Sequence, residues 1–414
     1  MISFKERVKK FDWDLVVVPV CLVLGLLVLW FFTGQWPNKT NAFNSFALQA
    51  NSWVQGHLNL IHGEYYTNLE LAIFNNQYFV SFPPFPSYIL LPFVWILKTV
   101  NTPDHWLAVF SYLVAGVYAV KLFKVIRTES DGAACFFPIF LLMASNVVYT
   151  SMNGWVWFIA QNFAFTLSLV AIYYAVQKKG GLSLALWACA VGCRPMQILY
   201  LPVLLLILYR QIKKEDSQTT LLSTIKHKWY WVIPTGIIGL SYMILNFLRF
   251  GNITEFGHNY LPEFTRTTTG QFDLSYLAAN WAKLFRLPEQ IAETGRMNFY
   301  YFDGFCVFLV SPILIAFIIA LGIGIYRKTD NLLAILLPIL MVVHILLILS
   351  HKTLGGSHFG NRYFNDLLPF VYYGLLVYMP KNRWFTKLCY PLCAFGMLLN
   401  YVGTIVCYNN WFQY

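Results

Sequence analysis

Long apolar stretches, separated by short polar connections, recur along the whole chain. A helix needs about 20 apolar residues to cross roughly 30 Å of hydrocarbon. Eleven stretches reach or approach that length, at residues 15–32, 105–126, 133–149, 155–177, 181–193, 197–209, 229–248, 305–326, 331–350, 366–380 and 386–407. The pattern therefore predicts an all-α integral membrane protein with about eleven transmembrane helices.

A twelfth apolar stretch, FPPFPSYILLPFVWILK at 82–98, decides the orientation of everything after it. Its prolines, Pro83, Pro84, Pro86 and Pro92, each remove a backbone donor, which suits a segment on the membrane surface better than one inside hydrocarbon. If the stretch lies on the surface, 19 of the 29 lysines and arginines fall in short connections on one side. Because basic connections stay in the cytoplasm, we expect the N-terminus inside and the C-terminus outside.

The composition agrees with a multi-pass membrane protein. Hydrophobic residues make up 58% of the 414 positions and charged residues 11%, which is too apolar for a soluble domain of this size. The net charge of +11 comes mostly from the inner connections, so it reports orientation toward an anionic leaflet and not affinity for nucleic acid. Those connections contain neither a P-loop nor a GxGxxG motif, which argues against a cytosolic nucleotide donor. No internal repeat or linker divides residues 1–414, so we expect one polytopic domain.

This orientation places three sizeable regions outside, at 33–104, 249–304 and 351–365. We expect them to form a cap over an active site. Apolar residues at helical spacing predict helices lying on the membrane surface at 41–56 and 274–287.

Two carboxylates stand alone in the first outer region. Glu64 and Glu70 are the acids between the first span and Asp104, in a loop that is otherwise neutral. A sugar hydroxyl needs a positioned carboxylate to accept its proton, and a site screened from water raises the pKa of a glutamate toward that use. The alternative is a pair of solvated loop carboxylates. Just after Glu70, Asn75–Asn76 separates two aromatic and β-branched runs and predicts a tight turn, because asparagine tolerates positive φ.

The run LELAIFNNQYFVSFPPFPSYILLPF at 69–93 resembles the first outer loop of the GT-C superfamily, polytopic glycosyltransferases that use polyprenyl-phosphate sugars. RFGNITEFGHNYLPEF at 249–264 and FGNRYFNDLLPF at 359–370 are similar as well. The resemblance implies that an acid of this loop, here Glu70, is the catalytic base, and that the Phe-Pro-Pro element begins a surface-lying helix. The predicted topology is similar to that of the protein mannosyltransferase branch.

Arg362 is a candidate for binding an anion. It lies at or just before the N-terminus of the predicted span 366–380, where free backbone N–H groups and a guanidinium together attract negative charge. His358 offers a further donor nearby. In the alternative interpretation, Arg362 reaches toward lipid headgroups or pairs with Asp366 one turn further on.

Arg194 lies between two apolar segments of about 13 residues, each only about 20 Å long as a helix. The turn Cys193–Arg194–Pro195 is therefore expected below the outer surface, or within a re-entrant hairpin. An arginine at that depth is costly unless it meets water, an acid or a phosphate, so it indicates a cavity. The alternative is a structural ion pair with Glu64, Glu70 or Asp366.

The region 249–304 contains Glu255, His258 and Glu263 within nine positions. These residue types can bind a divalent cation or line a substrate site, but their spacing matches no specific metal motif, and a solvated loop face is the simpler interpretation. Nothing in the sequence requires a metal or another cofactor.

Together with this resemblance, the sequence predicts a GT-C-like transferase, multi-pass in a bacterial plasma membrane. It would move a sugar, with inversion, from a polyprenyl-phosphate-linked donor to a glycan, lipid or protein acceptor on the outer face. Glu70 or Glu64 would be the base, and Arg362, Arg194, His358, Asp366, Glu255 and His258 would bind substrate. A transporter or lipid-linked sugar flippase is the rival prediction, because it also needs an outward cavity with a buried arginine.

Overall fold

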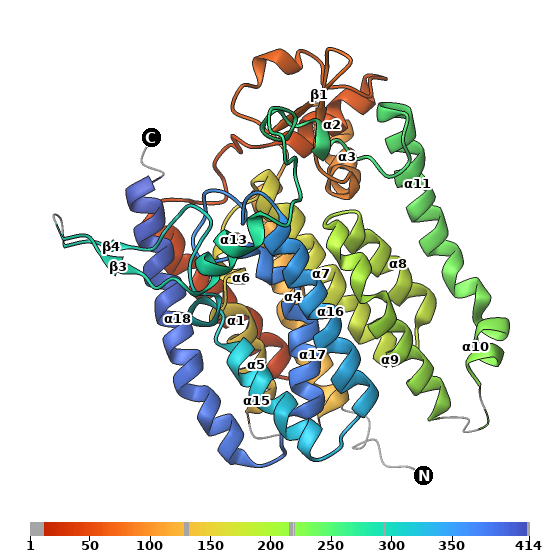
Figure 1. Cartoon of the computed structure of the whole chain (residues 1–414), viewed down its shortest axis with the longest axis vertical. Coiled ribbons are helices and arrows are strands. Elements are labelled where there is room, and N and C mark those ends of the chain that lie inside the picture. Colours follow the sequence, from red (N-terminus) through yellow and green to blue (C-terminus); the bar gives the residue numbers. More distant parts are fainter. Residues whose placement is uncertain (1–11, 128–131, 215–217, 219, 293–294, 412–414) are drawn as a thin grey trace, which may run out of the picture.

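The computed structural model describes residues 12–127, 132–214, 218, 220–292 and 295–411 (Figure 1). A bundle of roughly parallel and antiparallel helices forms the body of the molecule. Its helices are α1 (Asp14–Thr33), α4 (Asp104–Ile126), α5 (Ala133–Met143), α7 (Val156–Val176), α8 (Gly180–Val191), α9 (Leu201–Lys213), α11 (Val232–Phe250), α15 (Ile313–Tyr326), α16 (Asn331–Ser350), α17 (Leu368–Tyr378) and α18 (Arg383–Trp411). Each predicted apolar stretch overlaps one of these helices.

Within the described residues, seven helical stretches are long and apolar enough to cross a membrane. The remaining apolar helices α5, α8, α15 and α17 are shorter. Short helical pieces extend them or their neighbours at the cap-facing end, namely α6 (Val147–Thr150), η3 (Pro195–Tyr200), α14 (Val307–Val310) and η6 (Arg362–Asp366). The helical membrane architecture is thus confirmed, while the number of spans and their orientation stay predictions.

Burial separates the centre of the bundle from its edge. In the apolar part of α7, 83% of the residues are buried inside the protein, whereas only 6% are buried in the apolar part of the stretch Lys226–Phe250, which ends with α11. Figure 1 shows α11 standing apart at one side, next to α8. A helix that is apolar and exposed over most of its surface suits contact with lipid.

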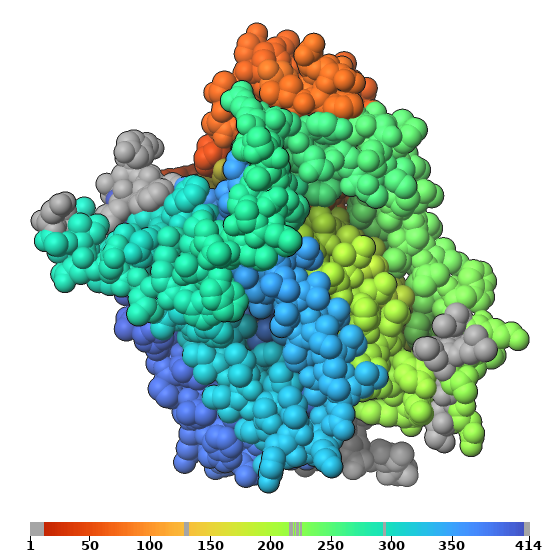
Figure 2. Space-filling model, viewed as in Figure 1, coloured from red at the N-terminus to blue at the C-terminus, as the bar shows by residue number. Residues whose placement is uncertain are grey.

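The cap lies at one end of the bundle and is built from the first outer region and the segment after α11 (Figure 2). The first outer region contributes α2 (Ser45–Val54), η2 (Gly63–Tyr65), β1 (Leu71–Phe74), β2 (Gln77–Val80) and α3 (Phe85–Leu97). The later segment contributes η5 (His258–Tyr260), α12 (Pro262–Thr265), α13 (Tyr276–Phe285), β3 (Glu289–Gln290) and β4 (Met297–Asn298). The remaining pieces, α10 (Leu221–Lys228) and η4 (Trp229–Trp231), precede α11 at the opposite end.

Local features of the cap follow the sequence closely. Asn75 and Asn76 have φ values of 49° and 58° and join β1 to β2 in an antiparallel hairpin that pairs Leu71 with Val80, which confirms the predicted turn. Helices are present at both predicted places, as α2 and α13, while their position on the membrane surface stays a prediction. They are shorter than the amphipathic stripes that predicted them.

The proline-rich stretch forms α3, which begins directly after Pro84. This helix packs against α2 in the cap, and Ser87 Oγ donates a hydrogen bond to Gln49 Oε1 at 2.8 Å. Its far end exposes Trp95 and Ile96. The position of α3 beside α2, away from the body of the bundle, agrees with a helix lying on the membrane (Figure 1).

The orientation can be tested by labelling single cysteines with a membrane-impermeant thiol reagent. Asn101, Asn252 and Lys179 are all exposed, so access to each is limited only by the side of the membrane on which it lies. Asn101→Cys and Asn252→Cys should label in intact cells, and Lys179→Cys should label only after permeabilisation. Protection of Asn101→Cys would make α3 a true span and reverse the assignment of every later loop.

Candidate functional site

A cavity of about 520 Å³ lies between the cap and the bundle. All three outer regions and the turn after α8 contribute to its walls. Charged and polar lining residues include Glu70, Glu255, His258, Arg194, His351 and Arg362. The structure thus brings together, around one space, residues that are almost three hundred positions apart in the chain.

Glu70 directly precedes β1, so the hairpin fixes its backbone, and its carbonyl accepts a hydrogen bond from Ser81 Oγ at 3.0 Å. Its carboxylate reaches the first turn of α7, where Trp157 Nε1 donates to Oε2 at 2.8 Å. The residue is exposed at the cavity wall, with protein close around its carboxylate. Partial desolvation by that protein raises the pKa of Glu70, against the opposing effects of the Trp157 hydrogen bond and the charge of Arg362. A higher pKa makes the carboxylate a better proton acceptor.

Glu64 lies elsewhere in the cap. It is part of η2, its side chain is 51% exposed, and its Oε1 lies 3.6 Å from His62 Nδ1. Glu64 does not line the main cavity but a smaller depression beside it, which Glu70 also borders. Of the two glutamates, the geometry favours Glu70 as a group that meets substrate.

Arg362 begins η6 and is only 4% exposed. Its Nε and Nη2 donate to the carbonyl oxygen of Gly355 at 3.2 and 2.9 Å. Its Nη1 is buried and has no hydrogen-bond partner within the described part of the chain. Burial lowers the pKa of Arg362, but guanidinium groups stay charged in proteins. A buried cation with unpaired N–H groups is stabilised by an anion that reaches them.

Arg194 is held by an acid. Its Nε lies 2.9 Å from Asp366 Oδ2, and the Asp366 side chain is completely buried. Gln161 Nε2 donates to the other carboxylate oxygen at 3.2 Å, and Gln197 Nε2 donates to the Asp366 carbonyl at 2.9 Å. The structural ion pair considered for Arg194 is therefore present. The alternative pairing of Asp366 with Arg362 is wrong, because η6 turns the two side chains toward different partners.

Tyr363 connects the two arginines. Its ring centroid lies 4.7 Å from the guanidinium carbon of Arg362 and 4.9 Å from that of Arg194. Contact with an aromatic ring stabilises a guanidinium while leaving its edge N–H groups available for hydrogen bonds. The ring lines the cavity as well.

The histidines of the cavity are neutral. Burial lowers the pKa of His258 to about 3 and that of His351 to about 4. Their Nδ1 atoms lie 3.1 Å from the Ser81 carbonyl oxygen and 2.7 Å from the Thr353 carbonyl oxygen. They can exchange hydrogen bonds with a ligand but add no positive charge.

His358 is placed differently from the prediction. It is completely buried and does not line the cavity. Its ring lies behind Gly355, close to Arg362, and its backbone N–H donates to the Tyr301 carbonyl oxygen at 2.7 Å. It therefore supports the wall of the cavity and does not face an anion within it.

The expected solvated loop face around Glu255 is also wrong. Glu255 is 8% exposed, and its two oxygens accept hydrogen bonds from Gly257 N–H and Asn259 Nδ2, both at 2.6 Å. These bonds use the carboxylate to fix the local turn. In the described ranges, no group of three or more His, Cys, Asp or Glu side chains is arranged to hold a metal ion.

Several lining residues were not singled out by the sequence. Trp157 is one of 14 tryptophans, and a tryptophan near the start of an apolar stretch is typical of an interfacial anchor. Gly355 and Tyr363 act through a carbonyl and a ring face, which no motif reports. His351 begins the third outer region, and that position was the only signal that could have identified it.

No known family model matches the chain, and no curated protein matches its sequence. The fold is similar to that of ArnT from Cupriavidus metallidurans in its crystal structure bound to undecaprenyl phosphate, with a TM-score of 0.55. The similarity covers 96% of this chain and 77% of that chain at 12% sequence identity. The two proteins therefore share their overall fold, which agrees with the resemblance noted in the sequence.

The Arg194–Asp366 pair should be important for stability. Arg194→Met leaves a buried carboxylate without its cation and should cost about 3 kcal/mol of unfolding free energy, most of which Arg194→Met/Asp366→Asn should restore. Thermal unfolding of the purified protein in detergent measures both changes.

The matched control is Arg210→Met, which removes the cation of the more exposed Arg210–Asp330 pair and should cost only about 1 kcal/mol. If Arg194→Met costs no more than this control, the two partners are not coupled as the geometry indicates.

Proposed function

We propose that the protein is a glycosyltransferase that moves a sugar from a polyprenyl-phosphate-linked donor to a hydroxyl group of a glycan, lipid or protein acceptor, on the outer face of a bacterial plasma membrane. One observation carries the proposal. A carboxylate with a raised pKa and a buried guanidinium with an unpaired nitrogen lie on the walls of the same cavity. The shared fold with a protein crystallised with undecaprenyl phosphate supports the same donor class.

The charges around the cavity support a donor with a single phosphate. Asp366 compensates Arg194, and the cavity histidines are neutral, which leaves Arg362 as the lining cation without a hydrogen-bonded acid among the described residues. A sugar linked to a lipid through one phosphate carries one negative charge. The phosphate oxygens that carry this charge can accept hydrogen bonds from the N–H groups that Arg362 does not already use.

In the proposed reaction, Glu70 and Arg362 have separate roles. Glu70 takes the proton of the acceptor hydroxyl, whose oxygen attacks the anomeric carbon and forms the new glycosidic bond. The bond between that carbon and the phosphate oxygen breaks, and the electron pair leaves with the lipid phosphate. Arg362 stabilises the charge gained by this phosphate, and attack opposite the leaving group inverts the anomeric configuration.

A transporter or flippase is less well supported. Such a protein must expose its binding groups alternately to both sides of the membrane, and its sites lie near the bilayer midplane. Here the acids, arginines and neutral histidines of the cavity belong to the cap and to the helix ends that meet it.

The role of Glu70 can be tested by transfer from a synthetic polyprenyl-phosphate sugar to an envelope extract of the source cells. Glu70→Gln keeps the size and the Trp157 contact but cannot accept a proton, so the transfer rate should fall about 100-fold or more. Glu64→Gln is the matched control and should have a much smaller effect. Equal losses of rate in the two variants, or a larger loss in Glu64→Gln, would show that Glu70 is not the base.

The pH dependence of transfer should report the pKa of Glu70. Transfer needs the deprotonated carboxylate, so the rate should rise with pH through a pKa above the usual glutamate value. Trp157→Phe removes a hydrogen bond that stabilises the charged form, so the acid limb of the profile should move to higher pH.

Trp155→Phe is the control for this shift, because it makes the same change two positions away from the residue that contacts Glu70. Its acid limb should stay where it is in the unchanged protein. An acid limb that does not move in Trp157→Phe, or that moves to lower pH, contradicts the assignment.

A further inference from the structure

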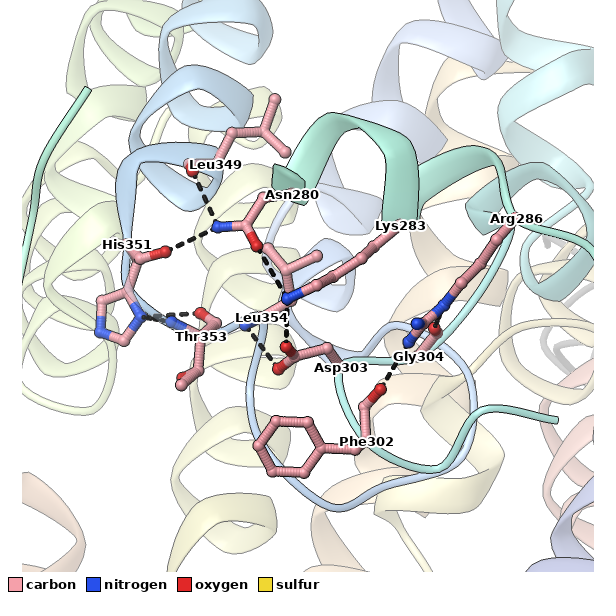
Figure 3. A network of polar contacts seen from close by, with 10 residues as sticks. All are labelled: Asn280, Lys283, Arg286, Phe302, Asp303, Gly304, Leu349, His351, Thr353 and Leu354. Carbon is pink, nitrogen blue, oxygen red and sulfur yellow. Dashed lines mark hydrogen bonds and ion pairs between the residues drawn. The ribbon is translucent and has the colours of Figure 1, made fainter. Parts of the chain in front are cut away.

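Beside the cavity, a buried carboxylate links α13 to the segment that supports Arg362 (Figure 3). Asp303 is 2% exposed, and its Oδ2 lies 2.6 Å from Lys283 Nζ in the last turn of α13. Lys283 also donates to Asn280 Oδ1 at 3.1 Å. Neither Lys283 nor Asp303 lines the cavity.

The other contacts of Asp303 enclose Gly355. Its Oδ1 accepts the Leu354 N–H at 2.8 Å, and its own N–H donates to the Gly356 carbonyl oxygen at 3.0 Å. Between these two bonds stands the Gly355 carbonyl, which accepts both the Nε and the Nη2 of Arg362. Polar contacts on either side, joined by the backbone of residues 354–356, thus connect Lys283 with the guanidinium.

The backbone around Asp303 is itself held on both sides. Arg286 donates to the carbonyl oxygens of Phe302 and Gly304 at 2.5 and 2.6 Å (Figure 3). Asp303 and Gly304 both have positive φ, at 63° and 69°, which turns this segment back against the chain around Gly360. A Cβ at Gly304 would lie 1.6 Å from the Gly360 carbonyl oxygen, so only glycine fits there.

α13 also fixes the start of the supporting segment. Asn280 Nδ2 donates to the carbonyl oxygens of Leu349 and His351, at 3.0 and 2.8 Å. These residues lie at the end of α16 and just beyond it. α13 therefore supports the 349–356 segment at two places. Asn280 contacts the start of the segment directly, and Lys283 acts on its far end through Asp303.

We propose that Lys283 and Asp303 are positioning residues for Arg362. By fixing the Gly355 carbonyl, the pair holds two guanidinium nitrogens in place and keeps Nη1 available for the donor phosphate. That the ligand is a phosphate rests on the proposed function, whereas the effect of Lys283 and Asp303 on the position of residues 353–363 does not. A displacement of about 1 Å at a group that stabilises charge in the transition state is enough to slow a reaction by about 100-fold.

A double-mutant series tests the proposal in the same transfer assay. Asp303→Ala removes the two side-chain contacts, with Lys283 and with the Leu354 N–H, and Lys283→Met removes the cation. Each variant should lower kcat about 10- to 100-fold with little change in the acceptor KM. Lys283→Arg keeps the charge and should recover most of the rate. In an Arg362→Lys background, Asp303→Ala should cause little further loss, because the group that it positions is already changed. Losses that multiply in the double variant would assign Asp303 a general structural role.

Hydrogen–deuterium exchange supplies a readout that needs no substrate. Peptides covering residues 353–363 should exchange faster in Asp303→Ala than in the unchanged protein, whereas Arg210→Met, a control pair at the other end of the bundle, should leave them unchanged. Unchanged exchange of this segment in Asp303→Ala overturns the positioning role. Faster exchange in a protein that transfers no sugar keeps that role and rejects only the proposed function.

Should Asp303→Ala fail to fold, Asp303→Asn takes its place. The amide keeps an acceptor for the Leu354 N–H but loses the charge that pairs with Lys283. Intermediate exchange and an intermediate kcat support the proposal, and values equal to those of the unchanged protein contradict it.

Discussion

The burial of one guanidinium constrains how the cap meets the helix bundle in this protein. Arg362 lies almost wholly inside the fold, two of its nitrogens share a single backbone carbonyl, and the third has no partner in the described chain. Burying a cation in this way is unfavourable unless the surroundings fix its position and an anion compensates its charge. The fold supplies the position through Gly355, and the cavity supplies the space for the anion.

Arg194, the second arginine at the cavity, differs from Arg362 because an acid compensates its charge. Asp366 neutralises Arg194 and is itself held by two glutamines from α7 and η3, so this pair can stabilise the meeting point of three helical elements. Tyr363 contacts both guanidiniums and links the compensated site with the open one. Across the cavity, Glu70 receives a hydrogen bond from Trp157 and is surrounded by protein that raises its pKa. Acid and cation thus share one space without forming an ion pair with each other, which leaves both available for a ligand.

Features set by local chemistry could be predicted from the sequence. The Asn75–Asn76 turn follows from the tolerance of asparagine for positive φ, and α3 begins directly after the Phe-Pro-Pro element, as the resemblance implied. The identity of partners could not be predicted. Asp366 follows Arg362 by four positions, yet its partner is Arg194, 172 residues away, because η6 and the turn after α8 meet only in the folded chain. Likewise, Gly355 and Trp157 act through contacts between elements, and no spacing along the chain reports such contacts.

The central claim concerns where a lipid phosphate binds, and a structure of the purified protein in lipid nanodiscs with undecaprenyl phosphate tests it most directly. The account predicts phosphate density inside the cavity, with an oxygen roughly 3 Å from Arg362 Nη1 and the Arg194–Asp366 pair intact. Phosphate density bound elsewhere, or an empty cavity at saturating lipid, would contradict it.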